Sequence, residues 1–176
     1  MIEALRLSAD GKITQSQEVR DRAFEAAPAT SGSVDGKPFT WMSDADPRLG
    51  PIMEVIINGQ YFWVPMHQIR KIHIEEPADL RDLVWMPAYF TWSNGGETVG
   101  LIPTRYPGSE LSEDPLILMS RKTEWLDQGE ELYTGMGQRM LTTDEQDYPL
   151  MDIREITFDT GEIVLEADAT IDDPEE

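Results

Sequence analysis

The sequence predicts an α+β fold: an antiparallel or mixed β-sheet body with short helices, preceded by a residual α-helical hairpin. Runs of β-branched and aromatic residues outnumber helical patterns, and they come in pairs joined by turn residues. The longest helical periodicity lies within the first 27 residues. The chain of 176 residues is 40% hydrophobic and holds five tryptophans, which is enough for the core of one domain.

The amino-terminal segment predicts two helices, Glu3–Ala9 and Thr14–Ala27, with Gly11 as a left-handed cap between them. Thr14 or Ser16 is the expected cap of the second helix. The second helix has an apolar stripe made of Val19, Ala23, Phe24 and Ala27. A first helix of two turns is too short to be stable alone, so we expect it to lean on a partner.

The strongest hairpin signal follows the linker. Two strand-forming runs, 52–57 and 61–64, flank Asn58 and Gly59, which suit a type I′ turn. Trp63 and Pro65 close the second run. One face of the first run is wholly apolar and the other is interrupted only by Glu54. We therefore expect this hairpin to lie at the centre of the core, inside a sheet covered on both sides.

The remaining runs extend the same pattern. Further strands are expected at Lys37–Met42, Lys71–Glu75, Met86–Trp92, Thr98–Ile102, Leu132–Thr142 and Met151–Phe158. A helical turn is expected at Met66–Arg70 and a short helix at Pro77–Leu83, whereas Pro103–Glu110 is too rich in proline and glycine for regular structure.

These patterns divide the chain into three parts: a helical hairpin at 1–28, an α+β body at 29–160 and an acidic tail at 161–176. The tail has no aromatic residue, and we expect it to be frayed and solvated.

The charge is extreme, because 14 basic and 34 acidic residues give a net charge of −20. Such a chain repels phosphate backbones and anionic membranes, so neither nucleic acid nor a membrane is an expected partner. No cysteine is present, which excludes disulfides and thiolate ligands. No apolar run approaches the roughly 18 residues of a membrane-spanning helix. We expect a soluble, cytoplasmic bacterial protein.

No pattern of catalytic or metal-binding residues emerges. His67 and His73 lack metal-ligand spacing, and Ser109 does not lie in a nucleophile elbow. Gly135 and Gly137 lack the third glycine of a dinucleotide-binding loop. We expect no enzyme activity, no cofactor, no metal and no small-molecule substrate.

Charged residues near turns have a structural interpretation. Asp44 and Asp46 are expected to cap backbone donors and to pair with Arg48. Arg81 near Trp85, and Arg105 beside Tyr106, allow two interpretations. These arginines either clamp the protein's own carboxylates or present a recognition surface, and the two roles can coexist.

Several blocks of the chain resemble the ImpE/TagJ family of type VI secretion accessory proteins. The blocks are DADPRLGPIMEVIINGQYFWVP (44–65), LRDLVWMPA (80–88), LIPTRYPGSE (101–110), RKTEW (121–125) and GMGQRML (135–141). They include Trp125, Gly137 and Arg139, which we assign a structural role. Family members usually carry a longer tetratricopeptide-like region, of which 3–27 resembles only the last hairpin.

The resemblance implies a non-enzymatic adaptor that binds the amino-terminal helix of the small sheath subunit TssB. It would act in sheath assembly, or in sheath handling by the ClpV ATPase. We expect an apolar groove bordered by 81–85 and 103–110, with these partner-binding residues: Arg81, Trp85, Arg105, Tyr106 and Ser109. The alternative, which rests on charge alone, is an acidic inhibitor or immunity-like protein that captures a basic partner.

Overall fold

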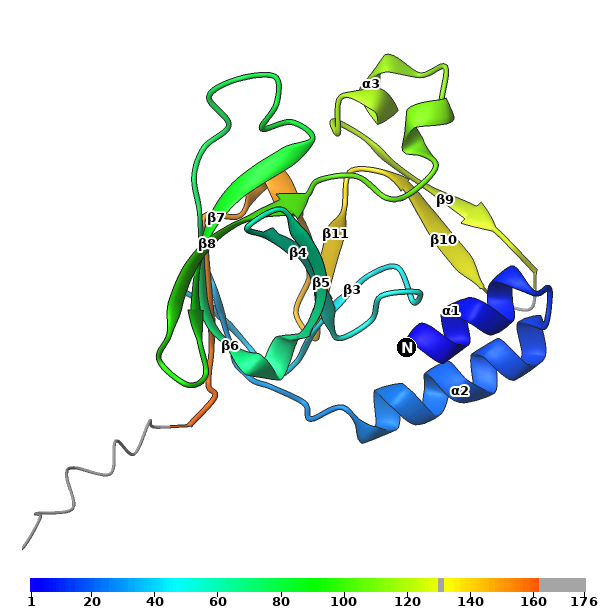
Figure 1. The fold of residues 1–176 in the computed structure, drawn as a ribbon, viewed down its shortest axis with the longest axis horizontal. Coiled ribbons are helices and arrows are strands. Elements are labelled where there is room, and N and C mark those ends of the chain that lie inside the picture. Colours follow the sequence, from blue (N-terminus) through cyan, green and yellow to red (C-terminus); the bar gives the residue numbers. More distant parts are fainter. Residues whose placement is uncertain (130–131, 162–176) are drawn as a thin grey trace, which may run out of the picture.

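The fold of the computed structural model is α+β, and the structure describes residues 1–129 and 132–161. A pair of helices lies to one side of a strongly curved body of strands (Figure 1). All strand pairs in the described part of the chain are antiparallel. The predicted α+β class is therefore confirmed, with an antiparallel sheet. The expected tail from 162 onward lies outside the described residues.

The main sheet has eight strands. Its strands, in spatial order, are β2 (Lys37–Phe39), β1 (Gly32–Val34), β13 (Glu155–Phe158), β6 (Ile69–Ile74), β7 (Trp85–Trp92), β8 (Glu97–Pro103), β4 (Ile52–Ile57) and β5 (Gln60–Pro65). Strands β7 and β8 form the predicted second hairpin. The last strand within the described residues, β13, lies between β1 and β6, so distant parts of the sequence meet within the sheet.

Two small sheets complete the body. One contains β12 (Asp147–Pro149), β11 (Met140–Thr143) and β3 (Met42–Asp44), and the other pairs β10 (Tyr133–Gly137) with β9 (Thr123–Asp127). The short helix α3 (Pro115–Leu118) begins at Asp114, whose side chain accepts a hydrogen bond from the Leu116 N–H.

The hairpin of β4 and β5 forms as predicted, but it does not lie at the centre of the sheet. Asn58 and Gly59 have φ of 51° and 75°, as a type I′ turn requires. However, β4 is next to last and β5 is the edge strand. The prediction of a central hairpin was wrong because apolar composition does not specify which strands pair.

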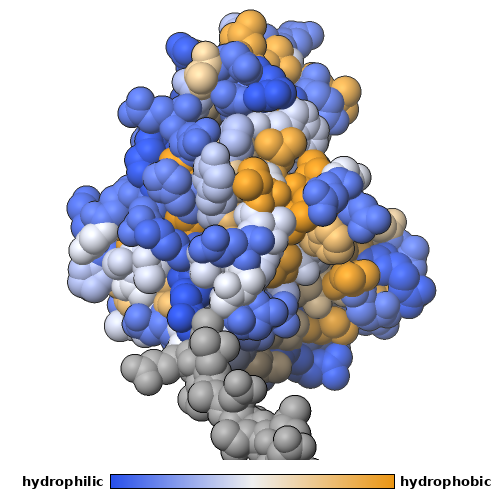
Figure 2. Space-filling model, turned by 60° about the vertical axis from the view of Figure 1, so that its left-hand side comes forward, coloured by the Kyte–Doolittle hydropathy of each residue, from blue (hydrophilic) through white to orange (hydrophobic). Residues whose placement is uncertain are grey.

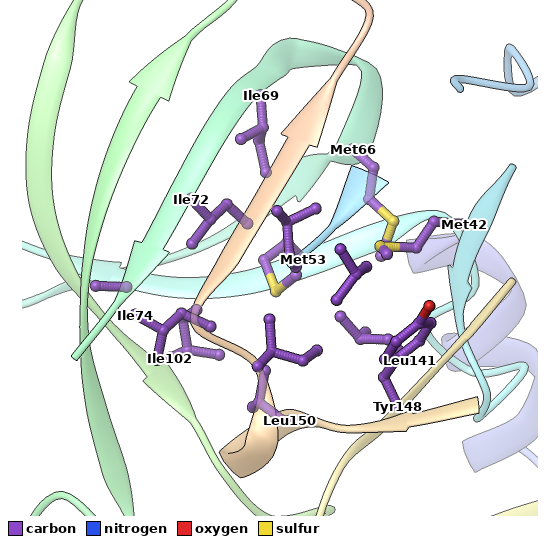
Figure 3. Close-up of a cluster of buried hydrophobic side chains, with 14 of the residues drawn as sticks. Met42, Met53, Met66, Ile69, Ile72, Ile74, Ile102, Leu141, Tyr148 and Leu150 are labelled. Atoms are coloured by element: carbon purple, nitrogen blue, oxygen red, sulfur yellow. The ribbon is translucent and has the colours of Figure 1, made fainter. Parts of the chain in front are cut away.

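The main core lies against β4, β6, β7 and β13. It gathers buried aliphatic and methionine side chains from positions between Val34 and Phe158, as Figure 3 shows for Met42, Met53, Met66, Ile72 and Leu150. Met53 and Val55 of β4 are buried in this core, whereas Glu54 on the opposite face is buried among charged groups. The apolar face of β4 therefore packs as predicted.

The two helices, α1 (Ile2–Ala9) and α2 (Ile13–Ala26), pack against each other. Gly11 lies between them with φ of 74°, as predicted. The expected cap at Thr14 or Ser16 was wrong, because α2 begins after Lys12 and places both residues inside the helix. The buried Ser16 hydroxyl instead donates to the Ala4 carbonyl of α1, at 2.6 Å.

Other boundaries also differ from the predictions. The expected strand Met151–Phe158 begins only at Glu155, because Leu150–Asp152 form a 3-10 turn. The expected strand 37–42 is divided between β2 and β3, and the expected strand 132–142 is divided between β10 and β11. Residues 77–83 form hydrogen-bonded turns instead of a helix, because the Asp82 carboxylate accepts from two backbone N–H groups, of Ala78 and Asp79. No helix in the described ranges is long and apolar enough to span a membrane.

Candidate functional site

The turn 44–51 is organised by two aspartates. The Asp44 carboxylate accepts from the Asp46 N–H at 2.8 Å, and the Asp46 carboxylate accepts from the Arg48 N–H at 2.9 Å. Arg48 also donates from Nη2 to Asp46 at 2.6 Å. The Gly135 N–H donates to the same carboxylate at 2.7 Å, which joins the turn to β10. This arrangement matches the capping and ion pairing expected from the sequence.

A second set of contacts joins this turn to three distant segments. Arg139, which is 5% exposed, lies with Nη1 3.5 Å from Asp44 and pairs through Nη2 with Glu54 of β4. Tyr106 donates to Asp44 at 2.7 Å, and the guanidinium of Arg139 lies 5.5 Å from the centre of its ring. We call Asp44, Asp46, Arg48, Glu54, Tyr106 and Arg139 the buried ion cluster.

The buried ion cluster has three carboxylates and two guanidinium groups, so one carboxylate is in excess. Burial raises the pKa of Asp44 to about 6 and that of Glu54 to about 7. Burial also raises the pKa of the Tyr106 hydroxyl and lowers that of Arg139. The two carboxyls therefore change protonation close to neutral pH.

A cavity of about 370 Å³ opens beside this cluster, and we call it the Trp85 cavity. Its walls come from 84–85 and 103–110, and Glu54 and Arg139 contribute charged groups to the lining. Tyr61 of β5, 55% exposed, and Trp85 of β7, 39% exposed, add aromatic surface. The two segments that the sequence analysis expected to border a groove therefore meet around one cavity.

The expected partner-binding residues take different positions. Trp85 and Arg105 line the Trp85 cavity. The Arg105 guanidinium donates from Nη1 to the Leu118 carbonyl at 2.6 Å. Arg81 is exposed and pairs with Asp79 and Asp82, outside the cavity lining.

Tyr106 and Ser109 were expected on a surface, but both side chains are buried, and of the two only Tyr106 contributes to the lining of the Trp85 cavity. The Ser109 hydroxyl donates to the Tyr106 carbonyl at 2.6 Å and accepts from the Gly137 N–H at 2.7 Å. The two residues fix the shape of the 103–110 segment and present no hydroxyl to a partner. Ser109 begins the turn 109–111, and Gly108 with φ of 91° precedes it.

The remaining residues singled out from the sequence support the surroundings. Trp63 donates through its indole N–H to the Tyr61 hydroxyl, and Pro65 ends β5. The ring of Trp125 lies 5.9 Å from that of Tyr106. Gly137 ends β10 with φ of 91°. Glu54 was missed as a site residue, since the sequence showed it only as an interruption of an apolar face.

A second cavity, of about 410 Å³, lies where α2 meets the body, and we call it the Trp41 cavity. Phe24 and Trp41 line it together with Pro47 and Pro51 of the turn 44–51, which we call the aspartate turn. Figure 2 shows one face of the molecule, on which hydrophobic side chains gather in patches between hydrophilic ones. Within residues 1–129 and 132–161, no group of three or more acidic or histidine side chains is arranged to hold a metal.

The profile of the ImpE protein family matches residues 36–157, which include the buried ion cluster and both walls of the Trp85 cavity. The chain belongs to the ImpE family.

Comparison with other proteins extends this ImpE assignment. A Pseudomonas aeruginosa (strain PAO1) protein named type VI secretion system accessory component TagJ is 46% identical over 159 residues, covering 90% of this chain and 55% of its own. The crystal structure of VPA1032 from Vibrio parahaemolyticus has 25% identity and a TM-score of 0.79, covering 86% of this chain and 57% of its own. This ImpE chain thus spans little more than half the length of these two relatives.

Proposed function

We propose that this chain is a cytoplasmic, non-enzymatic accessory component of a type VI secretion system. The observation that carries the proposal is the 46% identity to a protein named as such a component. That alignment covers 90% of this chain, and the family-matched body spans residues 36–157. A role in assembly or handling of the contractile sheath follows from the same resemblance.

The proposed partner is the amino-terminal helix of the sheath subunit TssB, with ClpV engaged through the sheath. An amphipathic helix needs a groove with apolar walls. Trp85, Tyr61 and Pro107 supply such surface in the Trp85 cavity. The net charge of −20 favours encounter with a basic partner.

The state of Glu54 supports a binding role over an acid–base role. One carboxylate oxygen accepts from the Tyr61 hydroxyl and the other pairs with Arg139. A general base needs a free oxygen within hydrogen-bond reach of its substrate. In this arrangement both carboxylate oxygens of Glu54 already have partners, and Glu54 holds the cavity wall.

The test is calorimetric titration with the amino-terminal helix peptide of the cognate TssB, at low and at high salt. Saturable binding that persists at high salt supports an apolar groove in this body. Binding that disappears with salt contradicts the groove and favours the acidic-capture alternative. Absence of binding at both salts, with the fold intact, removes the site from this chain.

Trp85 and Trp41 are equally exposed, at 39%, and line different cavities. Replacing each in turn therefore tests which cavity binds the helix. Trp85→Ala should weaken binding by about 2 kcal/mol, the size expected of an interface hot spot, and Arg105→Ala should weaken it as well. Trp41→Ala is the matched control, since Trp41 lines the other cavity. If Trp41→Ala alone weakens binding, the helix occupies the Trp41 cavity and the assignment to the Trp85 cavity is wrong.

A further inference from the structure

The outer edge of β5 differs from the opposite edge of the main sheet. β5 ends the sheet on one side, and within the described residues it pairs with β4 alone. Its sequence, QYFWVP, has no charged side chain, although 27% of the chain is charged. The opposite edge strand, β2, contains Lys37 and Pro38, two residue types that block further pairing. On β5, such a residue occurs only at the end of the strand, where Pro65 lies.

The register shows which backbone groups of β5 face outward. Ile57 and Gln60 flank the two-residue turn, so they form a hydrogen-bonded pair, and this alternates along the hairpin. Tyr61 and Trp63 then lie at positions whose N–H and C=O groups point away from β4. The pairing of Ile56, opposite Tyr61, with Leu101 of β8 agrees with this alternation. Two N–H donors and their carbonyls therefore form an open ladder, which Pro65 ends.

Each face of the hairpin offers a place for side chains of an added strand. Tyr61 lines the Trp85 cavity on one face. Phe62 and Val64 line a cavity of about 590 Å³ on the other face, together with Trp92. Successive side chains of a strand point to opposite faces, so a segment on this edge would place them beside Tyr61 and beside Phe62 in turn. Tyr61 and Phe62 are 55% and 41% exposed.

We propose that the β5 edge binds an extended, basic segment of a partner protein by strand addition. Backbone hydrogen bonds to Tyr61 and Trp63 supply the pairing, and side chains on the two faces supply the selectivity. The net charge of −20 favours a basic segment and opposes edge-to-edge pairing of two copies of this chain. This proposal is distinct from TssB binding, because it concerns the backbone edge of β5 and an extended ligand, although the Tyr61 side chain also lines the Trp85 cavity.

The experiment follows single amides by hydrogen exchange and NMR, with a short peptide of alternating lysine and valine as the probe. In the free protein, the amides of Tyr61 and Trp63 should exchange quickly, whereas those of Phe62 and Val64, which bond to β4, should be protected. The peptide should slow exchange at Tyr61 and Trp63 specifically. A peptide of alternating glutamate and valine should do so far less, and so should a lysine–valine peptide methylated on the pairing backbone nitrogens.

Phe62→Ala should weaken binding of the lysine–valine peptide by about fivefold, through loss of a cross-strand contact. Val99→Ala is the matched control, because Val99 is an exposed apolar residue on β8, an interior strand. Equal effects of the two variants would overturn the proposal.

Three results of the exchange experiment would also overturn it: no protection at Tyr61 and Trp63, protection only at another edge, and protection that grows with protein concentration without peptide. The last would indicate a second copy as the occupant. Exchange with the TssB helix peptide, measured in parallel, separates this site from the proposed function. The backbone groups of a helix are bonded within the helix, so helix binding should form no hydrogen bond to the amides of Tyr61 and Trp63.

Discussion

Among single residues, Arg139 contacts three other members of the buried ion cluster. Its guanidinium contacts the carboxylates of Asp44 and Glu54 and lies over the ring of Tyr106, and its side chain is 5% exposed. Removing charges from water costs free energy that a buried ion pair only partly recovers. The cluster is therefore better understood as a device that fixes the relative positions of four segments than as a large source of stability.

The raised pKa of Glu54 makes a prediction about stability and pH. In the folded state its pKa is about 7, above the ordinary value of 4.5, so the folded protein holds a proton that the unfolded chain releases. This proton contributes stability at low pH, and the contribution is lost as pH rises through the folded pKa. Between about pH 7.5 and about pH 5.5, the wild type should gain about 2 kcal/mol more stability than Glu54→Gln.

Urea unfolding at the two pH values measures this difference. Glu97→Gln, which changes an exposed glutamate, should keep the pH dependence of the wild type. If Glu54→Gln also keeps the pH dependence of stability of the wild type, then Glu54 does not change protonation between about pH 5.5 and about pH 7.5.

The sequence predicted local parts of the site and not its assembly. Asp44, Asp46 and Arg48 lie within five positions, so turn chemistry alone predicted their contacts. The pairing of Arg139 with Glu54 depends on how β4 approaches the segment between β10 and β11, and no local pattern encodes that approach. Burial of Tyr106 and Ser109 was missed for the same reason, since a polar residue in a proline-rich loop is ordinarily exposed.

At the scale of elements, the β10–β11 segment shows why strand boundaries differed from prediction. Gly137 ends β10 in a left-handed conformation, and the Gln138 N–H donates to the Lys122 carbonyl. The chain then turns so that Arg139 points into the buried ion cluster. Apolar alternation continues across this break, so periodicity predicted a single strand. The Asn58–Gly59 hairpin was predictable because both its strands and its turn are local.

Gly137→Ala tests this break. A Cβ at Gly137 would lie 2.0 Å from the Lys122 carbonyl oxygen, and φ is 91°. Gly129 has a similar φ of 80°, but a Cβ there would meet nothing within 4 Å, so Gly129→Ala reports backbone strain alone. We expect Gly137→Ala to be about 1–3 kcal/mol more destabilising than Gly129→Ala, measured by chemical denaturation. Equal losses of stability in the two variants would mean that the Lys122 carbonyl moves away from the added Cβ without a measurable cost in free energy.

For the whole molecule, the helix pair is joined to the body at the aspartate turn. The ring of Phe24 on α2 packs against Gly50, where a Cβ would lie 2.1 Å from the ring. The absence of a side chain at Gly50 thus lets the helix approach the turn that also carries Asp46. The position of the helices is linked in this way to the turn that anchors the buried ion cluster.

Phe24→Ala should loosen this junction. We expect hydrogen exchange in α1 and α2 to become faster, with a loss of about 2 kcal/mol of local stability, while β6 and β7 keep their protection. Leu5→Ala, which changes a residue of α1 that is 39% exposed, is the control and should change exchange little. If α1 and α2 are unaffected by Phe24→Ala, another contact holds the helices on the body.

The place of β13 in the main sheet has a consequence for synthesis on the ribosome. Residues 155–158 complete the sheet between β1 and β6, although some 80 residues of chain follow β6 before they emerge. Until then, both neighbouring strands expose pairing edges next to apolar side chains such as Ile72 and Val34. The nascent chain thus cannot close its main sheet before nearly the whole body has been translated, and its solubility during that interval depends on the many acidic side chains already present.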